Sequence, residues 1–276
     1  MDGRPSPHAP EPTLGRRSAA SPAGGAAPLL RETPVPDPAV PRMELVEWAA
    51  RWGATAGITT RGHGFSLGLW SDEHVGQVLT RWRAFRAAFH PRFPALVVSH
   101  QVHGTAVAWH EQRTDGWLIQ DGVDGHATAT RGILLGITVA DCVPVYLAVP
   151  HKGAFALLHA GWRGVAAGIL ERAFELLKRQ AFARAGDIVM HCGVGICGAC
   201  YEVGAEVLSC FSGQRETGQR PIDLRAILVA QAERLGVGTV SVSPWCSAHD
   251  RDHFFSHRAS GGRDGRMVAY LGQPLA

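Results

Sequence analysis

The chain has 276 residues and a mass of 29.5 kDa, enough for one large domain or two small ones with a buried core. Hydrophobic residues make up 46% of it and charged residues 18%, which excludes a disordered or membrane-embedded chain. The net charge of +3 is too small to indicate nucleic-acid binding, although it could help to hold an anionic small molecule. Six cysteines without a secretory signal pattern predict thiols or metal ligands in the cytoplasm rather than disulfides.

A Pro-rich segment opens the chain. Ten of the 17 prolines lie in the first 41 residues, among Ala, Gly and Ser. Such a segment has little apolar surface to bury, and its prolines oppose a helix. We therefore expect residues 1–42 to be a disordered tail, or an arm on the surface, and residues 43–276 to form a single domain.

Short β-branched and apolar runs predict seven strands in this domain. In chain order they span residues 96–99, 107–109, 133–139, 143–149, 154–158, 188–192 and 240–243. Apolar residues at helical spacing predict helices at 165–180 and 222–235, with Pro221 before the second and Asp223 in its first turn. Strands and helices intermix without a strict βαβ order, so we expect an α+β fold with mixed β-sheets.

One apolar stretch, residues 132–150, approaches the length of a membrane helix and carries Asp141 as its only charged residue. A carboxylate at the centre of a membrane helix costs about 2.5–3.5 kcal/mol, and Pro144 would interrupt the helix. We interpret the stretch as two buried strands, with Asp141 and Cys142 at the break between them.

Three potential metal ligands each follow a predicted buried strand: His103, Cys142 and His159. A rigid sheet can hold side chains from distant parts of the chain with the precision that zinc requires. One thiolate and two imidazoles provide three protein ligands and leave a fourth position for water or substrate, as in catalytic zinc sites. The same residue types allow Cys142 to be a nucleophile with His159 as its base, although His103 favours the metal.

Other cysteines and histidines form weaker patterns. Cys197 and Cys200 make a CxxC motif with Cys192 upstream, but no second CxxC follows at zinc-ribbon spacing. Residues 246–258 contain three histidines among Ser, Asp and Arg, which favours a hydrogen-bonded loop over a second metal site. The roles of these three cysteines stay open.

Five motifs follow one another along the chain. They are Gln101-Val102-His103-Gly104, Ala140-Asp141-Cys142-Val143-Pro144-Val145, His159-Ala160-Gly161-Trp162-Arg163-Gly164, Cys200-Tyr201-Glu202-Val203-Gly204, and Phe254-Phe255-Ser256 followed by Gly265-Arg266-Met267. Over residues 57–271 the chain resembles the YfiH-like, laccase-domain proteins, variously labelled polyphenol oxidases and purine nucleoside phosphorylases. The resemblance implies mixed β-sheets sandwiched by helices, distantly similar to cysteine deamidase toxins, and carries the metal site onto His103, Cys142 and His159.

The chain departs from the family pattern at several positions. It has Gly193-Val194 where Gly-Pro is usual, and Ala199 precedes Cys200 where the family has a second Cys. His257-Arg258-Ala259 replaces a Tyr-Arg-Arg run, and an Asn-Arg pair is absent around Thr80-Arg81-Trp82. The metal ligands are intact, so these differences bear on substrate preference rather than on the chemistry.

The family resemblance implies a zinc-dependent enzyme that phosphorolyses purine nucleosides, including methylthioadenosine, and deaminates adenosine. Zinc would activate water or polarise the purine. Phosphate would need a cationic site, for which Arg163 and Arg258 are the candidates. Asp141 is the candidate proton shuttle, or the carboxylate that orients a metal ligand.

Four alternatives remain at this point. The same metal, or the Cys142 thiolate, could serve an amidase that edits peptidoglycan precursors. A cysteine hydrolase could use Cys142 and His159 without metal. A copper polyphenol oxidase is disfavoured because multicopper sites need many His ligands and a blue-copper arrangement that this triad does not supply. A zinc-stabilised binding domain without catalysis would need a fourth ligand, for which His126 or His100 is the nearest candidate.

Overall fold

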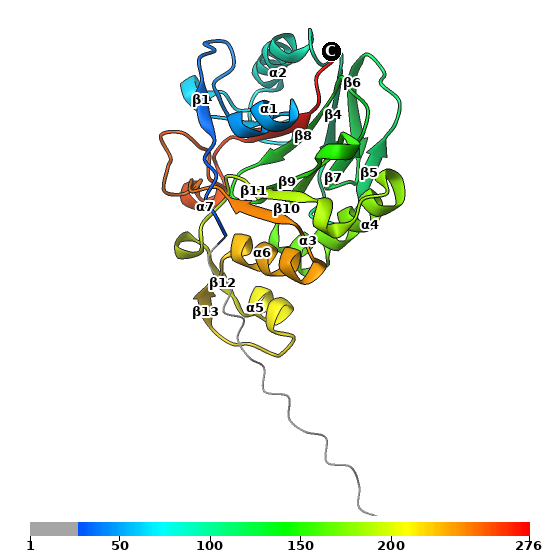
Figure 1. The fold of residues 1–276 in the computed structure, drawn as a ribbon. Coiled ribbons are helices and arrows are strands. Elements are labelled where there is room, and N and C mark those ends of the chain that lie inside the picture. Colours follow the sequence, from blue (N-terminus) through cyan, green and yellow to red (C-terminus); the bar gives the residue numbers. More distant parts are fainter. Residues whose placement is uncertain (1–26) are drawn as a thin grey trace, which may run out of the picture.

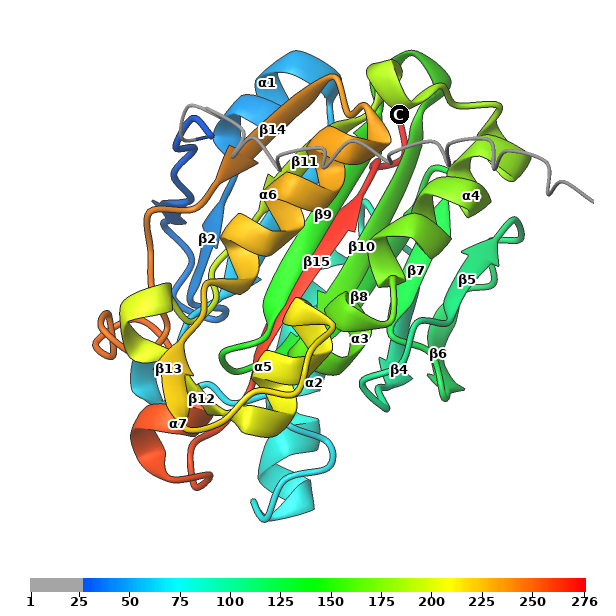
Figure 2. The same cartoon turned by 90° about the horizontal axis from the view of Figure 1, so that it is seen from below.

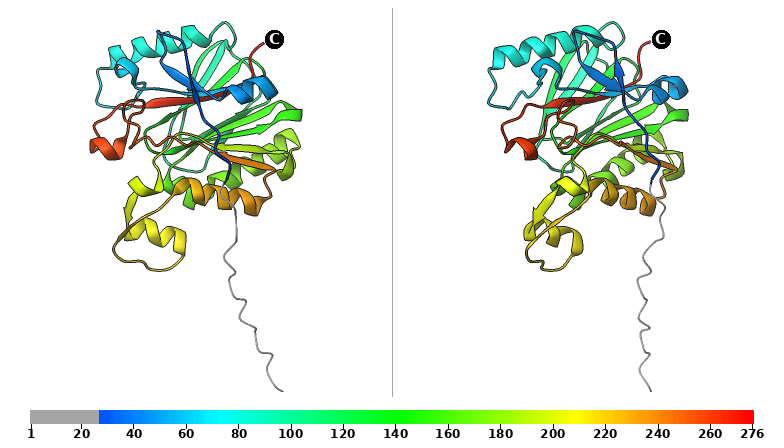
Figure 3. Two further views of the ribbon diagram at one scale, coloured as in Figure 1. Left: turned by 60° about the vertical axis from the view of Figure 1, so that its left-hand side comes forward. Right: turned by 90° about the vertical axis from the view of Figure 1, so that its left-hand side faces the viewer.

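Two mixed β-sheets lie face to face, and helices cover their outer faces (Figures 1 and 3). The structure, a computed structural model, describes residues 27–276. Helix α2 (Val75–Phe89) covers one sheet, whereas α3 (Trp162–Ala166), α4 (Ile169–Ala181) and α6 (Leu224–Leu235) cover the other. The arrangement confirms the predicted α+β fold with mixed sheets between helices.

The first sheet has seven strands, all antiparallel to their neighbours except that β4 runs parallel to β6 and β8. In sheet order they are β1 (Thr33–Val35), β2 (Arg42–Glu44), β3 (Thr55–Thr59), β15 (Met267–Gly272), β8 (Ile133–Val139), β4 (Ala95–His100) and β6 (Gly116–Asp121).

The second sheet has six strands, of which the outer pairs β14–β11 and β7–β5 are parallel. In sheet order they are β14 (Thr239–Val242), β11 (Val189–Cys192), β9 (Val143–Val149), β10 (Ala154–Ala160), β7 (Gly125–Thr128) and β5 (Val107–His110). Strands β12 (Glu202–Gly204) and β13 (Gln219–Pro221) form a separate antiparallel pair. The helices are α1 (Val46–Trp52), α2 (Val75–Phe89), α3 (Trp162–Ala166), α4 (Ile169–Ala181), α5 (Ala205–Ser212), α6 (Leu224–Leu235) and α7 (His257–Ser260).

Strands β8 and β9 lie at the centre of the molecule, and both have the bounds predicted from the sequence. Every residue of β9 is buried, because its alternate side chains face the helices on one side and the other sheet on the other. Their long apolar run is therefore a sheet core. Within residues 27–276, no helix has the length and hydropathy needed to cross a membrane.

The predicted helix at 165–180 is two helices, α3 and α4, which Figure 2 shows beside the second sheet. The break falls at Gly168, whose φ of +87° lies in the left-handed region that glycine adopts readily. The helix predicted at 222–235 is α6. Asp223 precedes it as the N-cap, with its carboxylate accepting from the backbone N–H groups of Arg225 and Ala226, so it does not lie in the first turn.

Residues 27–42 of the Pro-rich segment pack against the domain rather than forming a disordered tail, whereas residues 1–26 lie outside the described part of the chain. Strands β1 and β2 extend the first sheet, and Leu29 bridges to Val242 of the second. Glu32 is fully buried. Its carboxylate accepts from His191 Nε2 at 3.1 Å and from Ser243 Oγ at 2.7 Å. These specific contacts order a segment whose composition alone predicts disorder.

Replacing Glu32 by Ala should lower the free energy of unfolding by about 3 kcal/mol, because the buried polar groups of His191 and Ser243 lose their partner. Chemical denaturation of the variant measures this loss. Glu233→Ala, at an exposed position of α6, is the control and should change stability little. Equal stability of the two variants would show that the contacts of the Glu32 carboxylate do not stabilise the fold.

Candidate active site

The structure brings His103, Cys142 and His159 together from three separate segments. His103 follows β4, Cys142 lies between β8 and β9, and His159 lies inside β10, one residue before its end. Their potential ligand atoms all lie within 4.8 Å of one another. A metal ion between them would have one sulfur and two nitrogen ligands.

Two residues at this site have an unusual backbone conformation. His103 has a φ of +60° and Asp141 a φ of +83°, in the left-handed region that residues with a Cβ rarely adopt. Each lies where the chain leaves a buried strand, so surrounding contacts must hold it there. Such strained positions gather at functional sites.

The carboxylate of Asp124, a residue that the sequence analysis missed, holds this site in place. It is fully buried and accepts four N–H groups. Oδ1 accepts from the backbone N–H of His103 at 2.9 Å and from His159 Nδ1 at 2.8 Å. Oδ2 accepts from the backbone N–H groups of Val102 and Gly104, at 3.2 Å and 2.7 Å.

These contacts set the charge and tautomer of the neighbouring groups. Burial opposes ionisation of Asp124, but the hydrogen bonds from His159, Gly104 and Val102 outweigh it and lower the pKa of the carboxyl. Since the anionic carboxylate accepts from His159 Nδ1–H, the Nε2 atom of this imidazole is left to face Cys142 and His103.

Cys142 and His159 form a strongly polarised pair. Burial opposes ionisation of Cys142, but the charge of His159 and hydrogen bonds from His103 and His159 lower the pKa of the thiol to about 6. Burial likewise disfavours the imidazolium, yet Cys142 and Asp124 raise the pKa of His159 to about 9. Each group thus favours the charged form of the other, and a thiolate is both the metal ligand and the nucleophile of cysteine chemistry.

Gly161 lies against this group. A Cβ atom at this position would be 3.0 Å from His103 Cδ2 and 3.1 Å from Cys142 Sγ. Both contacts are too close for a side chain without displacement of a potential ligand. Glycine therefore suits the close approach of the backbone to the site.

The three residues line a cleft of about 460 Å³, within the usual range for small-molecule sites. Its wall includes the aromatic side chains of Trp70, Trp162 and Tyr201. Arg163 and Arg258, the predicted anion-binding residues, line the same cleft, and so does Arg266, which the sequence analysis did not select. The cleft therefore combines flat apolar surfaces with cationic groups.

Both predicted arginines rest on aromatic rings. The guanidinium of Arg163 lies 4.3 Å from the centroid of Trp162, and that of Arg258 lies 5.1 Å from Tyr201. Arg258 also donates to the backbone oxygen of Glu202. Arg163 is exposed, and its nearest carboxylate, Glu206, is 4.0 Å away.

Asp141 also lines the cleft, but its carboxylate is held differently from that of Asp124. Oδ1 accepts from Ser247 Oγ at 2.7 Å, and Oδ2 accepts from the backbone N–H of Arg258 at 2.6 Å. The carboxylate that accepts from a ligand imidazole, and so orients it, is that of Asp124. Asp124 lies between two glycines in Gly122-Val123-Asp124-Gly125, and this turn pattern could have identified the residue from the sequence.

Neither candidate for a fourth ligand joins the group. His126 is fully buried and contacts His110, with Nδ1 3.0 Å from Nε2 of that residue. His100 contacts Asp121 and stacks on Trp70. Over residues 27–276 the group therefore has three potential ligands, which leaves one tetrahedral position on the cleft side.

Comparisons with known proteins show the family to which the chain belongs. Residues 53–273 match the family described as "Multi-copper polyphenol oxidoreductase laccase". The chain is 32% identical over 254 residues to purine nucleoside phosphorylase YlmD of Geobacillus stearothermophilus, covering 80% of this chain and 90% of that protein. The crystal structure of YlmD from the same organism matches with a TM-score of 0.77 and 28% identity, over 87% of this chain and 98% of that one.

A second relative is named after a different activity. The chain is 34% identical over 190 residues to adenosine deaminase RL5 from an unknown prokaryotic organism, covering 62% of this chain and 72% of that protein. The chain belongs to the laccase-domain family, which confirms the membership that the five motifs predicted.

Replacing Asp124 by Asn should lower metal affinity about 10–100-fold. An amide offers one acceptor oxygen and would direct its NH₂ group at N–H donors that the carboxylate now accepts. Competition with a chelator measures this affinity. The exposed Asp115→Asn is the matched control, and an unchanged affinity in Asp124→Asn would show that this carboxylate does not organise the site.

Proposed function

We propose that the chain is a zinc-dependent purine nucleoside phosphorylase that also deaminates adenosine and phosphorolyses methylthioadenosine, in the cytoplasm. The observation that carries the proposal is the group of His103, Cys142 and His159 in a cleft lined by aromatic and arginine side chains. The names of the relatives YlmD and RL5 support the two activities.

The donor set fits zinc. Thiolate and imidazole are both zinc ligands, and three protein ligands with one position left for substrate or water is the ligand count of catalytic zinc sites. Blue copper uses the same three donors with a weak axial ligand, typically Met, and the described lining of the cleft contains no Met. When bound here, zinc supplies a Lewis acid on the cleft side.

The cleft residues bind and orient the substrate. The faces of Tyr201, Trp162 and Trp70 offer stacking surfaces for a purine base. Arg163 and Arg258 hold the phosphate that attacks the ribose, since a guanidinium binds phosphate through two parallel hydrogen bonds. Both guanidinium groups rest on aromatic rings, which limits their motion.

Asp141 is the proposed proton carrier of the cleft. Its carboxylate lies beside Cys142 in the chain and is fixed by Ser247 and the backbone of Arg258. A fixed carboxylate at the cleft can hold a proton near a purine nitrogen or the attacking group. Asp124 stays anionic and orients His159.

A cysteine hydrolase is the second candidate, because the lowered pKa of Cys142 and the raised pKa of His159 are those of an activated thiolate pair. An amidase acting on peptidoglycan precursors could use this pair or the metal. The metal-dependent and thiol-dependent mechanisms differ in whether a bound metal protects the Cys142 thiolate from alkylation.

Incubation of the isolated protein with inosine, adenosine and methylthioadenosine, with and without phosphate, tests the proposed activity. Free base that appears only with phosphate is the expected product of phosphorolysis. Inosine formed from adenosine without phosphate is the expected product of deamination. An absence of both products in metal-loaded protein would contradict the proposal.

Arg163→Ala should raise the KM for phosphate about tenfold or more, because it removes a charge-assisted contact of about 1.5–3 kcal/mol. Initial rates at varied phosphate concentration measure this change. Arg172→Ala, at an exposed position of α4, is the control. If KM for phosphate is unchanged in Arg163→Ala, this residue does not form the anion site.

Alkylation separates metal chemistry from thiol catalysis. A zinc-bound Cys142 should resist iodoacetamide, whereas a chelator should expose it and abolish turnover, and added zinc should restore both. Mass spectrometry of the alkylated peptides measures the exposure. Rapid alkylation of untreated protein, with activity that survives the chelator, would favour the cysteine hydrolase.

A further inference from the structure

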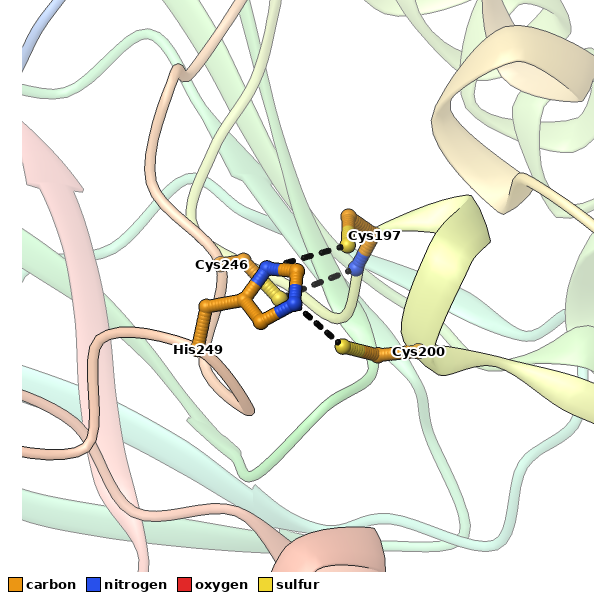
Figure 4. Close-up of side chains that lie close together, drawn as sticks. All are labelled: Cys197, Cys200, Cys246 and His249. Carbon is orange, nitrogen blue, oxygen red and sulfur yellow. Dashed lines mark hydrogen bonds between the residues drawn. The ribbon is translucent and has the colours of Figure 1, made fainter.

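A second group of metal-ligating side chains lies outside the cleft lining. Cys197, Cys200, Cys246 and His249 converge as Figure 4 shows, and their potential ligand atoms all lie within 4.8 Å of one another. His249 Nδ1 is 3.6 Å from Cys197 Sγ, and its Nε2 is 3.1 Å from Cys200 Sγ. Three thiols and one imidazole thus face a common centre.

Two tight turns carry these four residues. In the first, the backbone N–H of Cys200 donates to the oxygen of Cys197 at 3.0 Å. In the second, the N–H of Asp250 donates to the oxygen of Cys246 at 2.8 Å, and the N–H of Cys246 donates to Asp250 Oδ2 at 2.8 Å. Each turn places two ligands three positions apart, which is the spacing of structural zinc sites.

Contacts outside the four residues hold the two turns together. The N–H of Ser247 donates to the oxygen of Gly195 at 3.1 Å, which links the turns directly. Arg225, 8% exposed, donates to the backbone oxygens of Ser243 and Trp245 at 3.0 Å and 2.9 Å. The backbone on both sides of the group is therefore positioned by hydrogen bonds that do not involve the four ligands.

We propose that Cys197, Cys200, Cys246 and His249 bind a structural zinc ion. With Zn–S distances of about 2.3 Å, the sulfur atoms of a tetrahedral site are about 3.8 Å apart, so the observed group needs only a small contraction. Binding displaces the three thiol protons to solvent and forms three Zn–S bonds and one Zn–N bond. Four protein ligands leave no position for substrate, in contrast to the triad of the cleft.

This site is hard to recognise in the sequence because no second CxxC follows Cys197 and Cys200 at zinc-ribbon spacing. The partners, Cys246 and His249, come from the segment interpreted as a hydrogen-bonded loop, and they form a CxxH pair. A redox pair would need only Cys197 and Cys200. The convergence of a third thiol and an imidazole favours zinc over a disulfide.

The zinc ion would also brace the catalytic cleft. Tyr201, which lines the cleft, directly follows Cys200. Ser247, which directly follows Cys246, donates to the carboxylate of Asp141. Loss of the ion should therefore lower the melting temperature by several degrees.

Two measurements on the purified full chain test the proposal. Elemental mass spectrometry counts the zinc ions, and X-ray absorption spectroscopy identifies their ligands. Two zinc ions per chain are expected, a count that also rests on the proposed zinc of the triad. Cys142→Ala and Cys246→Ser should each retain one, and the exposed Cys210→Ser, the matched control, should retain two. The zinc in Cys142→Ala should show three sulfur ligands at about 2.3 Å and one nitrogen at about 2.0–2.1 Å.

The outcomes separate the two sites. One zinc in the wild type that is lost in Cys246→Ser but kept in Cys142→Ala would support the structural site and contradict the zinc of the triad. One zinc lost in Cys142→Ala alone would overturn the structural site, as would a Cys197–Cys200 disulfide in the isolated protein. If Cys246→Ser does not fold, the ligand set measured in Cys142→Ala decides.

Discussion

The buried carboxylate of Asp124 makes the interactions on which the candidate active site depends. It joins the loop after β4, in the seven-stranded sheet, to His159 of β10, in the six-stranded sheet. A buried anion requires compensation, and here the four N–H groups that supply it belong to the segments that carry the histidines of the triad. The charge that stabilises the fold at this point therefore also orients the potential metal ligands.

The face-to-face sheets explain why the site forms where it does. His103 leaves one sheet, His159 lies near the end of a strand of the other, and Cys142 lies in the turn that connects β8 to β9 across the two. The left-handed backbone of His103 is held by the N–H contact to Asp124. The geometry follows from packing of the two sheets rather than from any local sequence pattern.

The features that could be predicted from the sequence are those determined by residues close together in the chain. The bounds of β8 and β9 follow from apolar runs between turn residues, and the triad was found because each ligand lies at or near the end of a buried strand. Contacts between distant segments were not predictable. Asp124 and its partner His159 are 35 residues apart in the sequence, and Glu32 and His191 are 159 residues apart. Cys246 and His249, the partners of Cys200, lie about 50 residues downstream of it. The break between α3 and α4 was missed because a single Gly168 does not outweigh the helical pattern around it.

We propose that His103, Cys142 and His159 hold a metal ion in the cleft. Anomalous diffraction at the zinc edge, from crystals of the protein as isolated, would locate this ion. We expect a peak at about 2.0–2.3 Å from one ligand atom of each of the three residues, with the fourth coordination position of the ion open to the cleft. Protein that phosphorolyses nucleosides but shows no peak at these residues, with a free Cys142 thiolate, would contradict it.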